Sequence, residues 1–382
     1  MKTKRMFLTV GAVGLFAMSL SAQVTTVEGD LLGVDSDTLL VNYFSISDLK
    51  RENLKVDTIA MKQGRFTYNV EIGNVPAEIY FYAKPKGSEA SSLHKTVGVV
   101  AFPGETLRLS GSMEDYRVEG NTFHKDYAEA TEGWKSIRKR MEATTEVIMK
   151  MQQDGKLTPQ RIDSLRRIYQ PIANEMSDCK EQYVRKYPDN DVSVYLLSDL
   201  GGARAKDLLP LVGEKAKMGP MASLYRAMQD ALKEAEERQA ASQNIVEGKE
   251  APDFMLKDIE GKDFTLSSLR GKYVVLDFWG SWCGWCIKGL PDMKKAYGKY
   301  KDRMEIVGID CGDTEAKWKA AVAEHDIPWL HVRNEGNNDL TVTYAVKGYP
   351  TKIVINPEGK IARVIVGEDP AFYDYLDSLF KQ

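Results

Sequence analysis

The sequence predicts three successive parts: a β-rich segment, a helical segment and a carboxyl-terminal α/β domain. Short β-branched and aromatic runs separated by glycines characterise residues 24–121. Apolar residues at intervals of three and four characterise residues 122–242. Beyond residue 250, apolar runs and helical patterns alternate, and this alternation is typical of an α/β sheet covered by helices.

The first part contains three runs with the composition of strands, at residues 38–43, 65–70 and 78–82. Glycines such as Gly64 and Gly73 punctuate them, and the spacing predicts a small antiparallel sandwich or barrel. The segment contains no cysteine and no cluster of titratable residues. We therefore expect a docking or spacer role for it rather than a catalytic one.

The second part is expected to be helical throughout. Thr158 followed by Pro159 is a favourable start for a long helix, and its apolar stripe includes Cys179. Pro171 lies inside this helix and should kink it or divide it in two. Cys179 is expected to be a buried, unreactive thiol rather than a redox partner. Residues 243–250 are expected to be a linker into the last domain, residues 251–382.

The amino terminus has the pattern of a secretory signal. Lys2, Lys4 and Arg5 precede an apolar run over residues 6–20, and small residues follow it. We expect cleavage after about residue 22 and a periplasmic location, although an uncleaved anchoring helix is the alternative. No cysteine follows the run, so no lipoprotein acylation is expected, and no later stretch is long and apolar enough to span a bilayer.

Composition narrows the possible partners. Without residues 1–22 the chain carries 49 basic and 55 acidic residues, a net charge of −6. Such a chain is not suited to bind nucleic acid or an anionic membrane surface. Four cysteines in 382 residues are few for an exported protein, so the fold should not depend on disulfides.

The chemistry is expected at Cys283 and Cys286, which are separated by two residues. The run over residues 273–278 is apolar except for Asp277 and predicts a strand buried on both faces. Residues 287–301 have helical periodicity. Cys283 should therefore lie at or near a helix amino terminus, where the partial positive charge favours the thiolate that attacks disulfides.

Two other interpretations of this cysteine pair are weaker. A zinc site needs two further ligands, but Cys179 and Cys311 are isolated and the four histidines form no ligand pair. A purely structural bridge is disfavoured because so short a loop removes almost no chain entropy. The sequence therefore predicts no metal site and no cofactor.

The sequence around the cysteines resembles a known family. Residues 277–286 resemble the active-site strand and turn of thioredoxin, and residues 348–351, with the apolar run 353–355, resemble its cis-proline loop and next strand. Residues 251–266 resemble the leading hairpin of the periplasmic branch, which includes the reductases of cytochrome c maturation. The resemblance covers residues 244–382 and implies a thioredoxin fold of the TlpA/ResA type, within the AhpC/TSA-redoxin-like proteins. The β-rich segment resembles an uncharacterised domain of exported Bacteroidetes proteins.

This resemblance implies a role for each residue of the pair. Cys283 is expected to be the attacking thiolate, nearer the surface, and Cys286 the more protected thiol that resolves the mixed disulfide. Asp277, buried in an apolar strand, should have a raised pKa and accept the proton of Cys286. Thioredoxin pairs this aspartate with a lysine on the neighbouring strand, and the matching stretch here, residues 305–310, contains none.

Substrate contacts are expected from Trp282, Tyr349 and Pro350. Pro350 should follow a cis peptide bond, which would bring the backbone of Tyr349 next to the sulfurs. Trp285 stands where the family usually has proline. Cys311 is expected either to be a nearby regulatory thiol or to be merely half-buried.

The predicted function is that of a periplasmic thiol:disulfide oxidoreductase. A reductase is favoured, acting on protein disulfides and dithiols and kept reduced by a membrane electron donor. An oxidase or isomerase would use the same residues. A peroxiredoxin is disfavoured because residues 279–282 lack the threonine and proline that bind peroxide. The remaining alternative is a binding or scaffold protein in which the thiols are incidental.

Overall fold

The computed structural model describes residues 24–34, 36–83, 96–336 and 339–380. The expected signal segment, residues 1–22, lies outside the described residues. The chain divides into two compact units, Met1–Gln229 and Asp230–Gln382, and the division falls inside one long helix, α7 (Ala222–Ser242). Each unit is described by itself below.

The first unit begins with two four-stranded sheets, ordered β4-β1-β7-β8 and β3-β2-β5-β6. The predicted strands are therefore present, but the pairing is not wholly antiparallel, because β1 and β7 are parallel neighbours. The strands are β1 (Val24–Leu32), β2 (Thr38–Ser45), β3 (Lys55–Ala60), β4 (Arg65–Glu71), β5 (Ala77–Ala83), β6 (Thr96–Ala101), β7 (Thr106–Ser112) and β8 (Tyr116–Glu119).

Alternating side chains explain how these sheets hold together. In β4 every second residue is buried, which places Phe66 and Tyr68 on the inner face. Both rings contact Phe81 of β5, at centroid distances of 5.1 and 6.1 Å respectively. The two sheets thus share one apolar core, as in a sandwich.

Helices follow directly after β8. Thr158 caps the longest of them, accepting a hydrogen bond from the backbone N–H of Arg161 as predicted, and that helix continues through Pro171 rather than dividing. The helices are α1 (Thr122–Glu132), α2 (Lys135–Gln153), α3 (Pro159–Lys186), α4 (Asp191–Ser198), α5 (Gly202–Leu208), α6 (Glu214–Lys217) and the 3₁₀ turn Leu209–Leu211.

Cys179 on α3 is not buried as predicted. Its exposure is intermediate. Partial burial, followed by the charges of Glu175 and Asp178, raises the pKa of the Cys179 thiol. The side chain therefore stays a thiol near neutral pH.

The second unit is built on one five-stranded sheet, ordered β13-β12-β11-β14-β15. Strands β11, β12 and β13 are parallel, whereas β14 runs antiparallel to both β11 and β15. The strands are β9 (Met255–Lys257), β10 (Asp263–Thr265), β11 (Tyr273–Trp279), β12 (Met304–Asp310), β13 (Leu330–Arg333), β14 (Thr351–Ile355) and β15 (Ile361–Val366).

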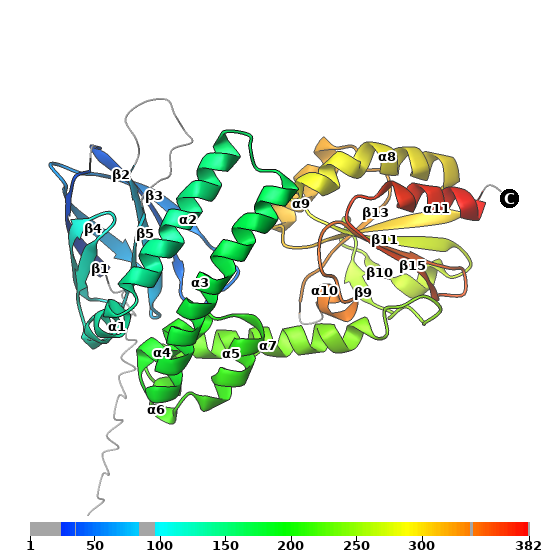
Figure 1. Cartoon of the computed structure of the whole chain (residues 1–382). Coiled ribbons are helices and arrows are strands. Elements are labelled where there is room, and N and C mark those ends of the chain that lie inside the picture. The colour runs from blue at the N-terminus through cyan, green and yellow to red at the C-terminus, as the bar shows by residue number, and fades with distance from the viewer. Residues whose placement is uncertain (1–23, 35, 84–95, 337–338, 381–382) are drawn as a thin grey trace, which may run out of the picture. The chain divides into compact units, whose positions relative to one another are not determined.

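Helices and the β9–β10 hairpin cover the two faces of this sheet. The core on one face includes residues of α8 (Gly284–Tyr300), α9 (Glu315–Glu324) and α11 (Pro370–Phe380). Figure 1 shows α8 and α11 side by side there. The core on the other face includes the hairpin, α10 (Leu340–Thr343) and the end of α7. Odd-numbered residues of β11, such as Val275 and Trp279, face α8, and even-numbered ones face the hairpin.

The segment predicted to be a linker, residues 243–250, is attached to the second unit. Ile245 is buried in the core on the hairpin side. The backbone N–H of Gly248 donates to the carbonyl of Ile361 at 2.7 Å, and the N–H of Ile361 donates to the carbonyl of Lys249 at 2.8 Å. These residues therefore behave as the first turn of the domain rather than as a free connection.

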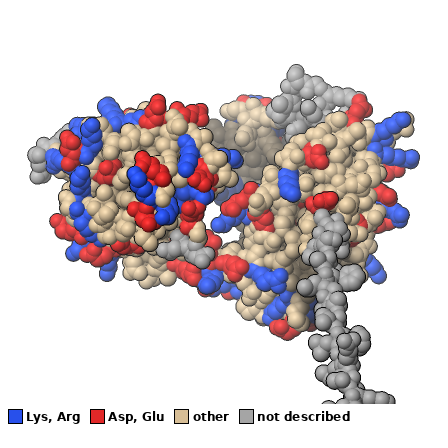
Figure 2. All heavy atoms as spheres, turned by 180° about the vertical axis from the view of Figure 1, so that it is seen from behind, with Lys and Arg blue, Asp and Glu red and all other residues tan. Residues whose placement is uncertain are grey.

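The hydropathy of the helices and the distribution of surface charge bear on how the molecule meets its surroundings. Of the helices in the described ranges, none combines the length and the hydropathy that a bilayer span requires. Figure 2 shows basic and acidic side chains interspersed on the face presented there, without a large region of one sign.

Candidate active site

The two cysteines lie where β11 ends and α8 begins. Cys283 is the N-cap residue of α8, and its Sγ accepts a hydrogen bond from the backbone N–H of Cys286 at 3.2 Å. Cys286 occupies the first turn of α8, and the two sulfurs form a disulfide, with the Cα atoms 5.2 Å apart. The cap places one sulfur at the positive end of the helix, where a thiolate is stabilised.

Exposure does not distinguish the two cysteines in this oxidised form. Each retains 6 % of its surface, so the prediction that Cys283 lies nearer the surface is wrong here. The disulfide joins the two residues, and both belong to the core beneath α8. What distinguishes the two residues is the cap, since the helix N–H group points at the sulfur of Cys283.

A neighbouring loop anchors the residues before Cys283. The Ser281 backbone N–H and hydroxyl both donate to the Asp313 carboxylate, at 2.6 and 2.7 Å. The Trp282 indole donates to the carbonyl of Cys311 at 3.0 Å. Gly280 is required beneath this indole, because a Cβ atom there would overlap the Trp282 ring. The active-site turn is therefore held from the segment after β12.

Asp313 is in turn supported by a second carboxyl group, that of Asp310. Burial, followed by a hydrogen bond with Asp313 and by its charge, raises the pKa of Asp310 to about 8. Burial also acts on Asp313, but hydrogen bonds with Asp310 and Ser281 outweigh it and lower the pKa of Asp313. At neutral pH the pair therefore shares one proton and carries one negative charge.

Asp277 lies on the same face of the sheet as α8 and is buried. Burial raises the pKa of Asp277 to about 6, the Lys352 charge opposes that rise, and the Glu368 charge adds to it. Among the described residues, its Oδ1 atom has no hydrogen-bond partner. A carboxylate in this state is able to accept a proton near neutral pH.

The lysine that the sequence seemed to lack is present on the other neighbouring strand. On the parallel side, Gly308 of β12 lies opposite Asp277 and has no side chain that could pair with it. On the antiparallel side, Lys352 of β14 lies opposite Asp277, and only 1 % of its surface is exposed. Its Nζ donates to the Glu368 carboxylate at 2.6 Å. Residues 305–310 contain no lysine, as the sequence shows, but Lys352 on β14 supplies a positive charge that acts on Asp277.

Of the three predicted substrate residues, Trp282 directly precedes Cys283, and Tyr349 packs against the core that contains both cysteines. The Tyr349–Pro350 peptide bond is cis, which confirms the sequence prediction. The rings of Trp282 and Tyr349 meet edge to face, with centroids 5.0 Å apart. Trp282 is 55 % exposed and Trp285 is 62 % exposed, so two indoles flank the sulfurs at the surface. Roles for these residues in substrate contact remain predictions.

Cys311 is buried rather than half-buried. Burial, followed by the charge of Asp310, raises the pKa of its thiol strongly. Its sulfur lies in the core on the hairpin side, whereas Cys283 and Cys286 belong to the core beneath α8. This arrangement does not favour a regulatory thiolate at Cys311.

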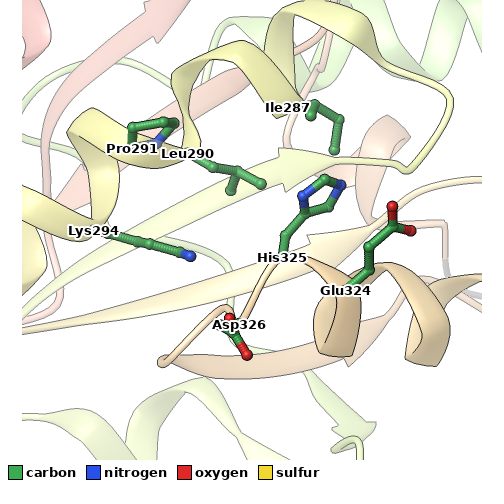
Figure 3. Close-up of a pocket in the computed structure, with 7 residues that line it drawn as sticks. All are labelled: Ile287, Leu290, Pro291, Lys294, Glu324, His325 and Asp326. Carbon is green, nitrogen blue, oxygen red and sulfur yellow. The ribbon is translucent and has the colours of Figure 1, made fainter.

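A shallow depression of about 250 Å³ lies between α8 and the end of α9 (Figure 3). Its lining combines apolar residues of α8 with charged groups: Ile287, Leu290, Pro291, Lys294, Glu324, His325 and Asp326. None of these is a predicted site residue. Within the described ranges, no three histidine, cysteine or acidic side chains gather as metal ligands would.

Comparison with known proteins identifies the same domain. The AhpC/TSA family model matches residues 247–364. A ResA thiol-disulfide oxidoreductase of Bacillus cereus is 40 % identical over 122 residues, which cover 32 % of this chain and 70 % of that protein. The ResA protein of Bacillus subtilis is 35 % identical over 141 residues, covering 36 % of this chain and 78 % of that protein.

A solved structure gives a similar match. It is the thioredoxin domain of a thiol-disulfide oxidoreductase from Bacteroides vulgatus, with 31 % identity and a TM-score of 0.34. The match covers 35 % of this chain and 97 % of that chain.

The strand order, the capped disulfide and the cis-proline loop define a thioredoxin-fold enzyme that exchanges thiols and disulfides. The chain belongs to the family of the ResA thiol-disulfide oxidoreductases. The sequence prediction of the family, of the fold class and of an oxidoreductase is thereby confirmed.

Sequence reasoning missed three groups near the site: Lys352, Glu368 and the Asp310–Asp313 pair. A signal existed for Lys352, since a lysine in the middle of an apolar strand is rarely buried without a partner. Glu368 follows a glycine after β15, and no local pattern marks it. The shared proton of the aspartates depends on their proximity, which their spacing alone does not reveal.

The Asp310→Asn variant tests the carboxyl pair through stability. The unfolded chain loses the Asp310 proton near pH 4, whereas the folded chain, with the pKa at about 8, keeps it. The folded state thus binds more protons between these values, so this group makes the free energy of unfolding fall as pH rises. We therefore expect the free energy of unfolding of the variant, relative to that of the wild type, to increase from pH 5 to pH 8. The increase should be at most about 1.4 kcal/mol per pH unit.

Urea unfolding at pH 5, 6.5 and 8 measures this difference. Asp302→Asn, which removes an exposed carboxylate of the same unit, is the matched control and should show no such trend. A difference between Asp310→Asn and the wild type that stays constant with pH would contradict the shared proton.

Proposed function

We propose that this protein is a periplasmic reductase of protein disulfides. One observation carries the proposal: a buried carboxylate whose pKa is raised to about 6, Asp277, lies on the sheet face beneath the helix that holds both cysteines. Transfer of electrons to a substrate needs a thiolate first and a proton acceptor second. Cys283 and Asp277 supply these two functions in the proposed mechanism.

In the first step, the Cys283 thiolate attacks one sulfur of a substrate disulfide. A new S–S bond joins Cys283 to the substrate, and the other substrate sulfur leaves as a thiolate that takes a proton from water. The N-cap position supports this role because the helix end stabilises negative charge on Sγ. Trp282, Tyr349 and Pro350 would contact the substrate chain.

In the second step, Cys286 gives its proton to the Asp277 carboxylate and attacks the sulfur of Cys283. The bond between Cys283 and the substrate breaks, and the second substrate sulfur leaves as a thiolate that takes a proton from water. The substrate has then gained two electrons and the cysteine pair has become the disulfide present in this structure. A membrane electron donor would reduce that disulfide again.

The proposed location rests on the amino-terminal sequence, where a basic start precedes an apolar run of 15 residues, 6–20. Disulfides persist in such an oxidising compartment, so a reductase there has substrates. An oxidase or isomerase would use the same sulfurs, and the redox potential of the cysteine pair distinguishes these activities from a reductase.

Trapping with the Cys286→Ser variant tests the mechanism. Without Cys286 the mixed disulfide on Cys283 cannot be resolved, so the variant should retain covalent partners that a reductant releases. Cys283→Ser should trap none and should reduce insulin disulfides roughly 1,000-fold more slowly than the wild type. Cys179→Ser is the matched control and should behave as the wild type. Equal, low rates for wild type and Cys283→Ser would overturn the enzymatic proposal.

Equilibration against glutathione tests the direction. In a reductase, the reduction potential of the Cys283–Cys286 disulfide should be about −270 mV, whereas a value of about −120 mV indicates an oxidant. Oxidised and reduced forms can be counted by alkylation and mass spectrometry of the peptide that contains both cysteines. A potential in the oxidant range would replace the reductase proposal with the oxidase one and leave the two-step exchange intact.

A further inference from the structure

Behind the cysteine pair lies a line of buried charges that the two-step mechanism does not yet use. Lys352 lies opposite Asp277 across β14 and β11, and side chains at opposite positions of antiparallel strands share one face. The Lys352 ammonium donates to Oε2 of Glu368 at 2.6 Å. The two side chains are only 2 % and 14 % exposed. The lysine therefore pairs with one carboxylate, that of Glu368, and lies across the strands from a second, that of Asp277.

The Glu368 carboxylate is fixed from its other side as well. The Tyr373 hydroxyl donates to Oε1 of Glu368 at 2.7 Å, and it also lies 3.4 Å from the carbonyl oxygen of Gly289. Gly289 is in α8, three residues after Cys286. A Cβ atom on Gly289 would overlap the Glu368 carboxylate, so the absent side chain leaves the space that Glu368 fills.

Few other charged or titratable groups face Asp277. Strand β12 contributes Gly308 opposite it, and the next strand contributes His331, whose pKa burial lowers to about 4, so that it is neutral. Tyr373 of α11 and the Cys311 thiol both sense the Asp277 charge, and burial keeps both protonated near neutral pH. Cys286 of α8 is the proton donor in the proposed mechanism. The charge state around Asp277 is therefore governed by Lys352 and Glu368.

We propose that Glu368 is a positioning residue for the second step: by holding the Lys352 ammonium, it moderates the pull of that charge on Asp277 and keeps this carboxylate basic enough to accept the Cys286 proton. The inference rests on the proposed function and deepens it. A lysine whose charge acted on Asp277 alone would favour the ionised carboxylate and weaken it as a base. Glu368 competes for the same ammonium, and its own negative charge also favours the protonated form of Asp277.

The proposal predicts opposite shifts for two substitutions. Glu368→Gln removes the negative charge that competes with Asp277 for the Lys352 ammonium. The pKa of Asp277 should therefore fall, by about one unit. Lys352→Met removes the ammonium, so the pKa should rise by a similar amount. If Glu368 and Lys352 had only a structural role, both substitutions would lower stability, and they would not shift the pKa of Asp277 in opposite directions.

A two-phase absorbance experiment on the full chain reads this pKa. The reduced protein reacts with one equivalent of the aromatic disulfide DTNB, and Cys283 attack releases the first coloured thiolate. Resolution by Cys286 then releases the second one and closes the disulfide. The rate of the second phase should rise with pH around a midpoint set by Asp277. We expect that midpoint to move about one pH unit down in Glu368→Gln and about one unit up in Lys352→Met.

Further variants keep the test decisive if either substitution disturbs folding. The double variant carries no charge at either site, which often restores a buried pair. Its midpoint should lie between those of the two single variants, because the two charges act on Asp277 in opposite directions. Gly289→Ala suits a helix and removes no charge, yet it displaces Glu368, so the midpoint should fall less than in Glu368→Gln.

Lys299→Met is the matched control, since it breaks a half-exposed lysine–carboxylate pair with Asp377 in the same unit and should leave the midpoint in place. Midpoints that stay unchanged in Glu368→Gln and Lys352→Met, or that move in the same direction in both, overturn the inference while the first phase remains normal. Loss of the first phase in the wild type would instead overturn the proposed function.

Discussion

The whole site depends on one hydrogen bond, from the Cys286 backbone N–H to the sulfur of Cys283. It makes a cysteine the cap of α8, so the helix begins at the residue that must carry negative charge. The buried strand β11 ends shortly before Cys283. Between them, Ser281 donates two hydrogen bonds to the Asp313 carboxylate. The turn therefore has little freedom, and the sulfur stays at the helix end whether it is bonded to Cys286 or to a substrate.

Beneath that helix, the sheet holds charges that a protein core normally excludes. Asp277, Lys352 and Glu368 are all largely buried, and burying charge is costly unless it is paired. The pairing of Lys352 with Glu368 offsets part of that cost, and within the described part of the chain Asp277 has no direct ion pair. Stability alone would favour apolar residues at these positions. The arrangement fits a site in which one carboxylate must gain and lose a proton near neutral pH.

Local sequence patterns predicted much of this architecture. The apolar run of β11 and the periodicity of α8 depend on neighbouring residues, the cis-proline loop was implied by the family resemblance, and the structure contains all three. The errors arose where long-range contacts decide. The family carries its lysine on the strand that corresponds to β12, whereas here the strand register places Lys352 of β14 opposite Asp277. The exposure of Cys179 and the protonation of Asp310 likewise depend on what packs against them.

The central claim is that Cys283 is acidic because it caps α8. The rate of its alkylation by iodoacetamide, measured against pH on the reduced full chain and followed by mass spectrometry of the peptide, tests this most directly. The account predicts a midpoint below about pH 7.5, as for cysteines at helix amino termini. A midpoint at about 8.5, the value of free cysteine, would contradict it, because the helix end would then provide no stabilisation of the thiolate.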